Sequence, residues 1–343
     1  MHKTSIPTKL VIANSLNEFC IEFENYLKDN QIDELLIVSG LTHLNNFCTE
    51  LTNKVSKTAK IEITTNLDIN KIKKNYSWIL GLGGGKVLDQ AKYLAACQKA
   101  NFISVPTLIT HDGICSPVAV IDDRSMGAIM PHALFVPLFI IQKSPIIHIK
   151  AGIGDLIANL SAIDDWKLAK TKNNEENDDF AIMISKKSAS DIILKLKNNY
   201  LKPYYSNPIE FLRSEIFLSS LIESLALSGI AMSITGNSRP CSGGEHLISH
   251  AIDKIFGHGT KAPHGIQVLI ASLYLEKYRT ESSLMSLFSS LKEFQAILEY
   301  YEFPTEFINI DINEKDLKNI IEMAPLTRPG RYSILNDIYI KNH

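Results

Sequence analysis

The amino-acid sequence predicts an α/β N-terminal part followed by an all-helical C-terminal part. Residues 9 to 121 alternate short apolar runs with amphipathic helical patterns, which is typical of a parallel sheet covered by helices. A run of glycines at 81 to 85 joins one of these apolar runs directly to a helix. After Gly154 the pattern is helical almost throughout. A chain of 343 residues is too long for one ordinary core, so we expect two domains.

Composition and charge exclude several classes of partner. The chain is 45% hydrophobic with a net charge of −2 and has no basic stripe, so we expect a globular protein that does not bind nucleic acid. Its five cysteines are odd in number and form no C-x-x-C pair, which indicates a reducing compartment. No signal peptide opens the sequence, and the longest apolar run is broken by Pro137. We therefore expect a cytoplasmic protein without a membrane span.

The first strands and helices follow one another closely. KLVIA (9–13) and ELLIVSG (34–40) predict two strands, separated by the amphipathic helix EFCIEFENYLKDN (18–30). A third strand, KIEITT (60–65), follows the helical pattern HLNNFCTELTNKV (43–55). This order predicts repeated strand–helix–strand units.

The glycine run at 81 to 85 ends the next strand and begins a helix. Glycines let the backbone approach a ligand closely, and the free N–H groups at a helix start attract phosphate. The dinucleotide motif G-x-G-x-x-G fits Gly81 and Gly83 but finds Lys86 at its last position, and a Walker loop needs Ser or Thr where Val87 stands. Neither motif is met, and a turn that only closes the strand against the helix is the alternative.

A second polar loop follows the next strand, FISVP (102–106). This loop is rich in hydroxyl, imidazole and carboxylate side chains. Two consecutive strands that end in such loops make a crevice at the carboxyl edge of the sheet, where open α/β folds bind nucleotides. The loop side chains are Thr107, Thr110, His111, Asp112 and Ser116.

Three long helical patterns follow, over 155–170, 178–200 and 209–234. Asp155 opens the first of them, after Gly152 and Gly154, and by itself is most simply an N-terminal cap.

The stretch from Cys241 to Gly265 gathers four of the ten histidines. His246 and His250 lie four residues apart in a segment of helical apolar spacing, so both project from one face of one helix. Leu247 stands where a zincin has its catalytic Glu, which argues against hydrolytic zinc chemistry. His264 lies in a Pro-His-Gly turn. An ordinary exposed histidine pair is the alternative to a metal site.

Five segments together resemble the sn-glycerol-1-phosphate dehydrogenases, in the superfamily of iron-containing alcohol dehydrogenases, glycerol dehydrogenase and 3-dehydroquinate synthase. The resemblance implies a dehydroquinate synthase-like fold, with a Rossmann-like dinucleotide-binding domain over residues 1–150 and a helical metal- and substrate-binding domain over 151–343. The site would lie in the cleft between these domains. The segments are GGGKVLDQAKYLA (83–95), FISVPTLITHDGICSPVA (102–119), GIGDLIANLSAIDDWKLA (152–169), TGNSRPCSGGEHLISHAID (235–253) and HGIQV (264–268).

The resemblance also implies roles for particular residues. One divalent metal, zinc before nickel or iron, would be held by Asp155, His246 and His264, with open positions for substrate oxygens beside Asp155. Asp112 and His250 would face the substrate as catalytic residues, although a turn residue and an ordinary helix histidine are the alternatives. The pyrophosphate would lie on Gly83, Gly84, Gly85, Lys86 and Val87, and the nicotinamide near Thr107, Thr110 and Ser116.

The activity that the resemblance implies is reduction of dihydroxyacetone phosphate to sn-glycerol 1-phosphate, a step of lipid biosynthesis, by a homo-oligomer that uses NADH or NADPH. His250, or a water that it holds, would supply the proton. Arg239 is the nearest candidate in the sequence for the substrate's phosphate, with Lys254 and Lys261 behind it, and a surface arginine is the alternative. A polyol dehydrogenase, a dehydroquinate synthase-like lyase and a non-catalytic nucleotide-binding protein remain open.

The sequence predicts no residue that excludes NADPH. Enzymes that use only NAD place an acidic residue at the end of a strand or some twenty residues past the glycine turn. The second predicted strand ends in Ser39 and Gly40 instead, and residues 100–103 are Ala, Asn, Phe and Ile. Ser39, Thr42 or His43 could donate to a 2′-phosphate.

Overall fold

The computed structural model describes residues 4–40, 45–66, 68, 71–122, 124–205 and 207–342. The chain forms two compact units that meet in sequence between Pro145 and Ile146. Thr42 and His43, named above for a 2′-phosphate, lie outside the described residues.

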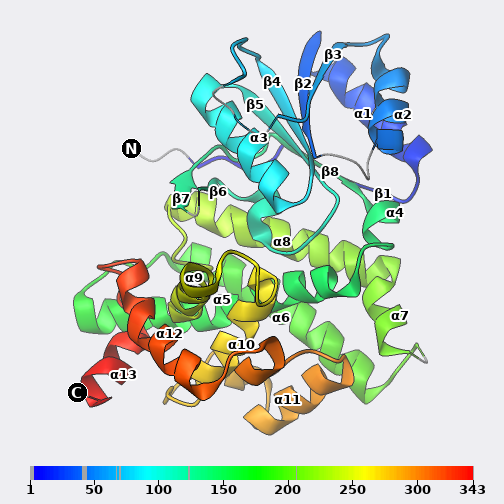
Figure 1. Cartoon of the computed structure of the whole chain (residues 1–343). Helices are drawn as coiled ribbons and strands as arrows, with labels where there is room; N and C mark the ends of the chain where they lie inside the picture. Colours follow the sequence, from blue (N-terminus) through cyan, green and yellow to red (C-terminus); the bar gives the residue numbers. More distant parts are fainter. Residues whose placement is uncertain are drawn as a thin grey trace. The chain divides into compact units, whose positions relative to one another are not determined.

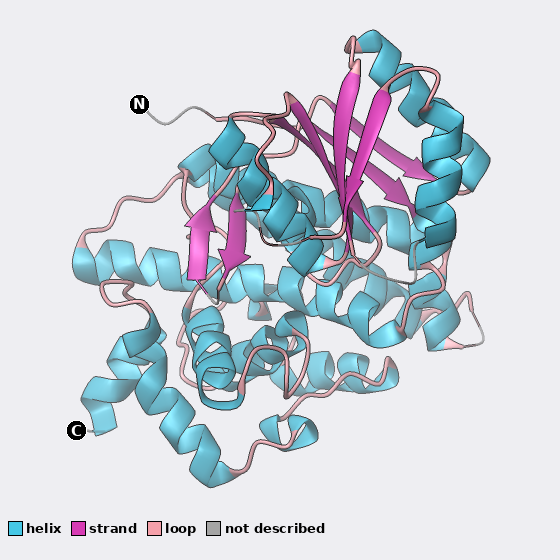
Figure 2. Cartoon of the chain, turned by 45° about the horizontal axis from the view of Figure 1, so that its top comes forward, coloured by secondary structure: helices cyan, strands magenta, loops and turns pink. Residues whose placement is uncertain are grey.

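The N-terminal unit contains a six-stranded parallel sheet in the order β1-β8-β5-β4-β2-β3. A separate antiparallel ribbon, β6–β7, is visible beside the sheet in Figure 2. The strands are β1 (Lys9–Ala13), β2 (Glu34–Ser39), β3 (Lys60–Thr64), β4 (Trp78–Gly83), β5 (Asn101–Pro106), β6 (Val118–Ile121), β7 (Arg124–Gly127) and β8 (Ala133–Pro137).

Helices cover both faces of this sheet (Figure 1). On one face, α1 (Leu16–Asp29) and α2 (Asn45–Val55) bury apolar side chains against the strands, and the rings of Phe19 and Phe23 meet Phe135 of β8 edge to face. On the other face lies α3 (Gly85–Gln98), against which β4 packs so closely that a Cβ on Gly81 would lie 2.9 Å from the Cβ of Ala91. A short helix, α4 (Leu138–Ile141), follows β8.

The predicted α/β fold is confirmed, and the sequence-predicted strands correspond to β1 to β5. The sequence did not identify β8, which lies between β1 and β5 in the sheet. All five residues of β8 are buried, so it lacks the alternation of polar and apolar residues that marks a half-buried strand.

All the regular secondary structure described in the C-terminal unit is helical. One predicted helix, over 209–234, is divided in two at Ser214, whose side chain caps α8 by accepting from the N–H of Phe217. The helices are α5 (Ile146–Asn173), α6 (Asp179–Leu201), α7 (Pro208–Arg213), α8 (Glu215–Thr235), α9 (Gly244–Phe256), α10 (His264–Glu276), α11 (Leu291–Tyr300), α12 (Glu314–Thr327) and α13 (Ile334–Asn342).

The N-cap interpretation of Asp155 is wrong. Helix α5 begins at Ile146, so Asp155 lies inside it and is 3% exposed. Gly154 serves a close approach of two helices, because a Cβ there would lie 2.2 Å from the carbonyl oxygen of Gly265 in α10. A Cβ on Gly265 would lie 1.9 Å from the carbonyl oxygen of Ala151. Only glycine fits at either position, so these residues fix α10 against α5.

Two helices, α5 and α8, are long and apolar enough to cross a membrane by length and composition alone. Most of each apolar window is buried inside the C-terminal unit, 83% in α5 and 67% in α8. Such burial is typical of core helices, which pass the same test as membrane spans.

Candidate active site

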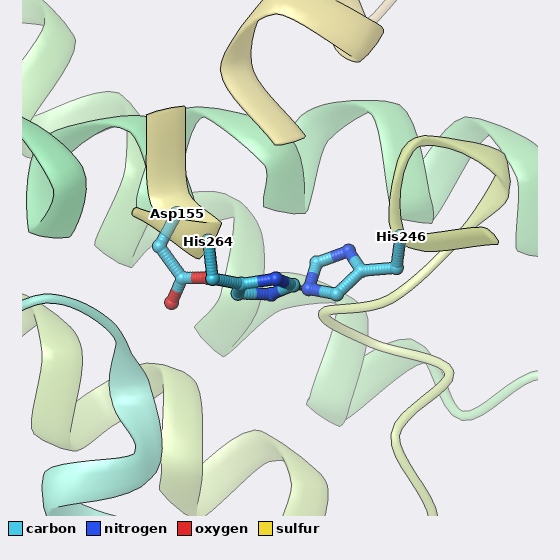
Figure 3. A group of neighbouring side chains, drawn as sticks. All are labelled: Asp155, His246 and His264. Atoms are coloured by element: carbon cyan, nitrogen blue, oxygen red, sulfur yellow. Dashed lines mark ion pairs between the residues drawn. The ribbon is translucent and has the colours of Figure 1, made fainter. Parts of the chain in front are cut away.

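Three side chains from three helices of the C-terminal unit form a candidate metal centre. Asp155 projects from the middle of α5, His246 from the first turn of α9, and His264 from the start of α10, and the three point toward one another (Figure 3). The Nε2 atoms of both histidines lie 3.9 Å from Oδ1 of Asp155. One ligand atom from each residue lies within 4.8 Å of the others, which is the spacing that a shared cation needs.

Glu245 fixes the tautomer of His246. Its Oε1 lies 2.8 Å from His246 Nδ1 and also accepts the N–H of Gly243 at 2.5 Å. An oxygen that accepts these bonds leaves the proton on Nδ1 and the lone pair on Nε2, the atom that faces Asp155. Glu245 is fully buried, and burial raises the pKa of its carboxyl group.

Ser249 fixes the tautomer of His264. Its hydroxyl donates to Gln267 Oε1 at 2.6 Å, so it accepts from His264 Nδ1 at 2.8 Å. The amide of Gln267 is oriented in turn because its Nε2 donates to Asp253 Oδ1 at 3.0 Å and to the carbonyl oxygen of Ala262. Both histidines therefore direct an unprotonated Nε2 toward Asp155. Imidazoles that bind metals are commonly oriented in this way, by a hydrogen bond from their other ring nitrogen.

A buried ion pair supports the start of α9. Asp165 of α5 accepts the N–H of Gly244 at 2.6 Å, and Arg279 binds its other oxygen at 2.9 Å. Both side chains are almost fully buried, and the positive charge of Arg279 opposes the rise that burial causes in the pKa of Asp165. No motif in the sequence predicted a role for this pair, for Glu245 or for Ser249. An acidic residue inside the apolar pattern of 155–170 was the available signal for Asp165.

The donor set suits a divalent cation. One carboxylate oxygen and two neutral imidazole nitrogens are ligands for zinc, iron or nickel, and three protein ligands leave coordination positions open for a substrate. The tautomers set by Glu245 and Ser249 fit this use, since each ring directs a lone pair to the same place.

His250 lies one turn after His246, and its ring centroid is 6.3 Å from that of His264. Its Nε2 is buried and has no hydrogen-bond partner among the described residues. Burial, followed by the charge of Arg328, lowers the pKa of His250 to about 3, so the ring is neutral at pH 7. The sequence leaves two proton sources open, His250 itself and a water that it holds. A neutral imidazole can orient a water molecule, which favours the second of them.

The glycine run lies at the carboxyl end of β4, in the N-terminal unit. Gly84 caps α3 without a side-chain hydrogen bond. A Cβ on Gly83 would lie 2.9 Å from that of Val87, and a Cβ on Gly85 would lie 2.9 Å from Nε2 of His111. Val87 therefore packs on the glycine turn, whereas Lys86 is exposed. The first turn of α3 presents backbone N–H groups, as in helix starts that bind phosphate.

A fully buried lysine braces the neighbouring loop. Lys92 of α3 donates to the carbonyl oxygens of Gly113 at 2.8 Å and Val118 at 2.7 Å. These bonds hold the short 3-10 helix that begins at Asp112, followed by the buried Ser116. The N–H of Thr107 donates to the carbonyl oxygen of Gly83, and half-buried Thr110 follows in the same loop. The nucleotide-binding residues predicted from the sequence thus lie at the junction of β4 with α3 and on the loop after β5, and β4 and β5 are neighbours in the sheet.

Arg239 is buried in the C-terminal unit. Its Nε donates to Glu175 Oε1 at 2.6 Å, its Nη2 pairs with the other carboxylate oxygen, and its Nη1 donates to the carbonyl oxygen of Tyr332 at 2.8 Å. These bonds favour a structural role for Arg239. Lys261, also named above, donates to the carbonyl oxygen of Asp311.

Comparisons with known proteins show the family and the fold of this chain. The family model of iron-containing alcohol dehydrogenases matches residues 17–145. A glycerol-1-phosphate dehydrogenase (NAD(P)+) of Nitrosopumilus maritimus is 30% identical over 98% of this chain and 92% of that protein, and one of Methanosphaera stadtmanae is 35% identical over 80% and 76%. The crystal structure of glycerol dehydrogenase from Schizosaccharomyces pombe has the same fold, with a TM-score of 0.74 at 18% identity over 98% of this chain and 86% of that one. The chain belongs to the glycerol-1-phosphate dehydrogenase family, within the iron-containing alcohol dehydrogenases.

Proposed function

We propose that this chain reduces dihydroxyacetone phosphate to sn-glycerol 1-phosphate with NADH or NADPH. The observation that carries the proposal is the convergence of Asp155, His246 and His264, with both Nε2 atoms directed at Asp155 by Glu245 and Ser249. It occurs in a chain that is similar over nearly its full length to proteins named for this activity.

The metal ligands have one net negative charge, so a bound divalent cation keeps a net positive charge. When bound, such a cation supplies Lewis-acid stabilisation of the negative charge that develops on a carbonyl oxygen, worth several kcal/mol. Asp155 and the two histidines would also orient the carbonyl, because three protein ligands leave coordination positions for it. His250 would hold the water that delivers the proton, because its buried Nε2 has no other partner in the described chain.

In the N-terminal unit, the backbone at Gly83, Gly84 and Gly85 would hold the pyrophosphate of the dinucleotide, with Lys86 and Val87 in the first turn of α3. The bound nicotinamide supplies the hydride. Thr107, Thr110 and Ser116 would border its ring, on a loop that Lys92 holds in place. Asp112 begins the 3-10 helix of that loop, where it would contact the substrate.

Oxidation of NADH and NADPH by the metal-loaded protein, followed with a panel of ketones, tests the function. We expect dihydroxyacetone phosphate to give the highest kcat/KM, and the product to resist an sn-glycerol-3-phosphate dehydrogenase. A preference for plain dihydroxyacetone would indicate a polyol dehydrogenase. No oxidation with any ketone would indicate a lyase or a binding protein and would overturn the proposal.

We expect comparable use of NADPH and NADH, and Gly40→Asp should reduce use of NADPH far more than use of NADH. Gly40 follows β2, and its φ lies outside the left-handed region, so an L residue is tolerated there. A Cβ at Gly40 would lie 3.2 Å from Cγ2 of Val87, a contact that a small shift relieves. The new carboxylate would bond the ribose hydroxyls of NADH and repel a 2′-phosphate. The measurement is kcat/KM for both cofactors.

Gly40→Asn is the matched control, because it has the same shape without the charge and should lower use of NADPH much less. Wild-type activity with NADH and none with NADPH would contradict the expectation. Equal losses with both cofactors in Gly40→Asp would show that the side chain disturbs Val87 and the glycine turn instead.

The metal and the compartment are also part of the proposal. We propose zinc as the first choice for the ligand set, ahead of nickel or iron, and a cytoplasmic location. All five cysteines are free, and four of them are buried, which fits a reducing compartment.

A further inference from the structure

Three arginines of the C-terminal unit gather on the segment 238–242, which leads into the metal-binding helix α9. We call Arg239, Arg328 and Arg331 the arginine cluster. Arg328 Nη1 and Arg331 Nη2 bind the same hydroxyl oxygen, Ser238 Oγ, at 3.2 and 3.0 Å. Arg331 Nη1 donates to the carbonyl oxygen of Ser242 at 2.6 Å. Three positive charges are thus brought together in a half-buried place beside the candidate active site.

The members of the arginine cluster differ in their partners. Arg239 has the carboxylate of Glu175 on two of its nitrogens. The bonds of Arg331 go to neutral oxygens, and no carboxylate lies within ion-pair distance of it among the described residues. Burial, and then the charges of Arg328 and Arg239, lower the pKa of Arg331 to about 9. A half-buried guanidinium beside other positive charges is destabilised by the loss of solvation and by repulsion. A bound anion would offset both effects.

The arginine cluster is related in space to His250, which is a candidate substrate-facing residue. Arg328 and Arg331 both act on the imidazole of His250 through their charge. Arg328 follows α12, a helix that packs on α9, and the ring of His250 stacks on that of the metal ligand His264. The ring of His250 therefore lies beside the candidate ligand His264, and the charges of Arg328 and Arg331 both lower the pKa of His250.

We propose that Arg331, assisted by Arg328, binds the phosphate of the substrate and so selects a phosphorylated ketone. This inference rests on the proposed function. In the proposed substrate only one methylene and one ester oxygen separate the carbonyl carbon from phosphorus, so the phosphate site must lie next to the metal. A guanidinium presents paired N–H donors that match two phosphate oxygens, and the anion would give Arg331 the ion pair that it does not form with the described residues. Arg239, which has Glu175, would hold the segment in place.

Steady-state kinetics of Arg331→Met and Arg331→Lys, with dihydroxyacetone phosphate and with dihydroxyacetone, test the proposal on the metal-loaded enzyme. Charge-assisted hydrogen bonds are worth enough that kcat/KM for the phosphorylated ketone should fall about 10- to 150-fold in Arg331→Met. The plain ketone has no charge to lose, so its kcat/KM should change by less than about 3-fold. Arg331→Lys keeps the charge but not the paired donors, so its loss should be intermediate. Lys318→Met removes an equal charge from an exposed position of α12 and is the control.

A second measurement does not depend on how fast the plain ketone reacts. Inorganic phosphate should raise the Tm of the wild type and compete with the phosphorylated ketone, and both effects should be lost in Arg331→Met. Equal losses on both ketones, or phosphate binding that survives in Arg331→Met, would overturn the assignment and leave the proposed function intact. A wild type that reduces no phosphorylated ketone, but whose phosphate binding requires Arg331, would instead overturn the proposed function and keep the anion site.

Discussion

His246→Ala is expected to abolish ketone reduction and to empty the metal site, while both units stay folded. The ring is one of three candidate protein ligands, and its Nε2 is directed at Asp155 by Glu245. Losing one of three ligands removes most of the affinity for the cation, and with it the Lewis-acid contribution to catalysis. The core of the C-terminal unit does not depend on this ring, because the His246 side chain is partly exposed at the candidate metal centre. Elemental analysis of the purified protein and kcat/KM for dihydroxyacetone phosphate are the measurements.

His148→Ala is the matched control for His246→Ala. His148 lies two turns before Asp155 on α5 and is not in the ligand group, so this variant should keep its metal. The fluorescence of Trp166, which is buried in α5, reports whether the C-terminal unit of each variant is folded. Full turnover by a wild type that holds no divalent metal in the presence of chelator would exclude the metal mechanism.

Arg279→Met should destabilise the C-terminal unit by about 3 to 5 kcal/mol, the usual loss when one partner of a buried ion pair is removed. Arg279 is 3% exposed at its side chain and pairs with the fully buried Asp165. Without it, the partners of Asp165 among the described residues would be two backbone N–H donors, from Gly244 and Ile334. Because Asp165 holds the start of α9, metal affinity should fall as well.

Urea unfolding of Arg279→Met is best followed in a Trp78→Phe background. The chain has two tryptophans, Trp78 in the N-terminal unit and Trp166 in the C-terminal unit, so this change leaves one fluorophore in the unit of interest. Lys187→Met breaks the exposed pair with Asp191 and should cost less than about 1 kcal/mol. If Arg279→Met costs no more than this control, the buried pair does not stabilise the unit.

The nucleotide-binding part of the fold was largely predictable because its features are local in sequence. Strand–helix alternation predicted the parallel sheet, and the glycine turn predicted the entry to α3, because both depend on spacing along the chain. The exceptions were the β6–β7 ribbon and β8. The residues of β8 are all buried and give no alternation. The place of β8 between β1 and β5 is decided by pairing with strands far away in sequence.

The sequence by itself determined the division into an α/β part and a helical part. It also supplied the candidate ligand types: a histidine pair at helical spacing, a third histidine in a turn, and an acidic residue after two glycines. Only the tertiary structure decided what those residues do. The glycines beside Asp155 let α10 touch α5 and do not begin a helix, because a Cβ on Gly154 or Gly265 would strike the facing backbone. The structure paired Arg239 with Glu175 and left Arg331 on neutral oxygens. The spacing of residues along the chain does not predict which arginine forms an ion pair, because the partners meet only when distant segments pack.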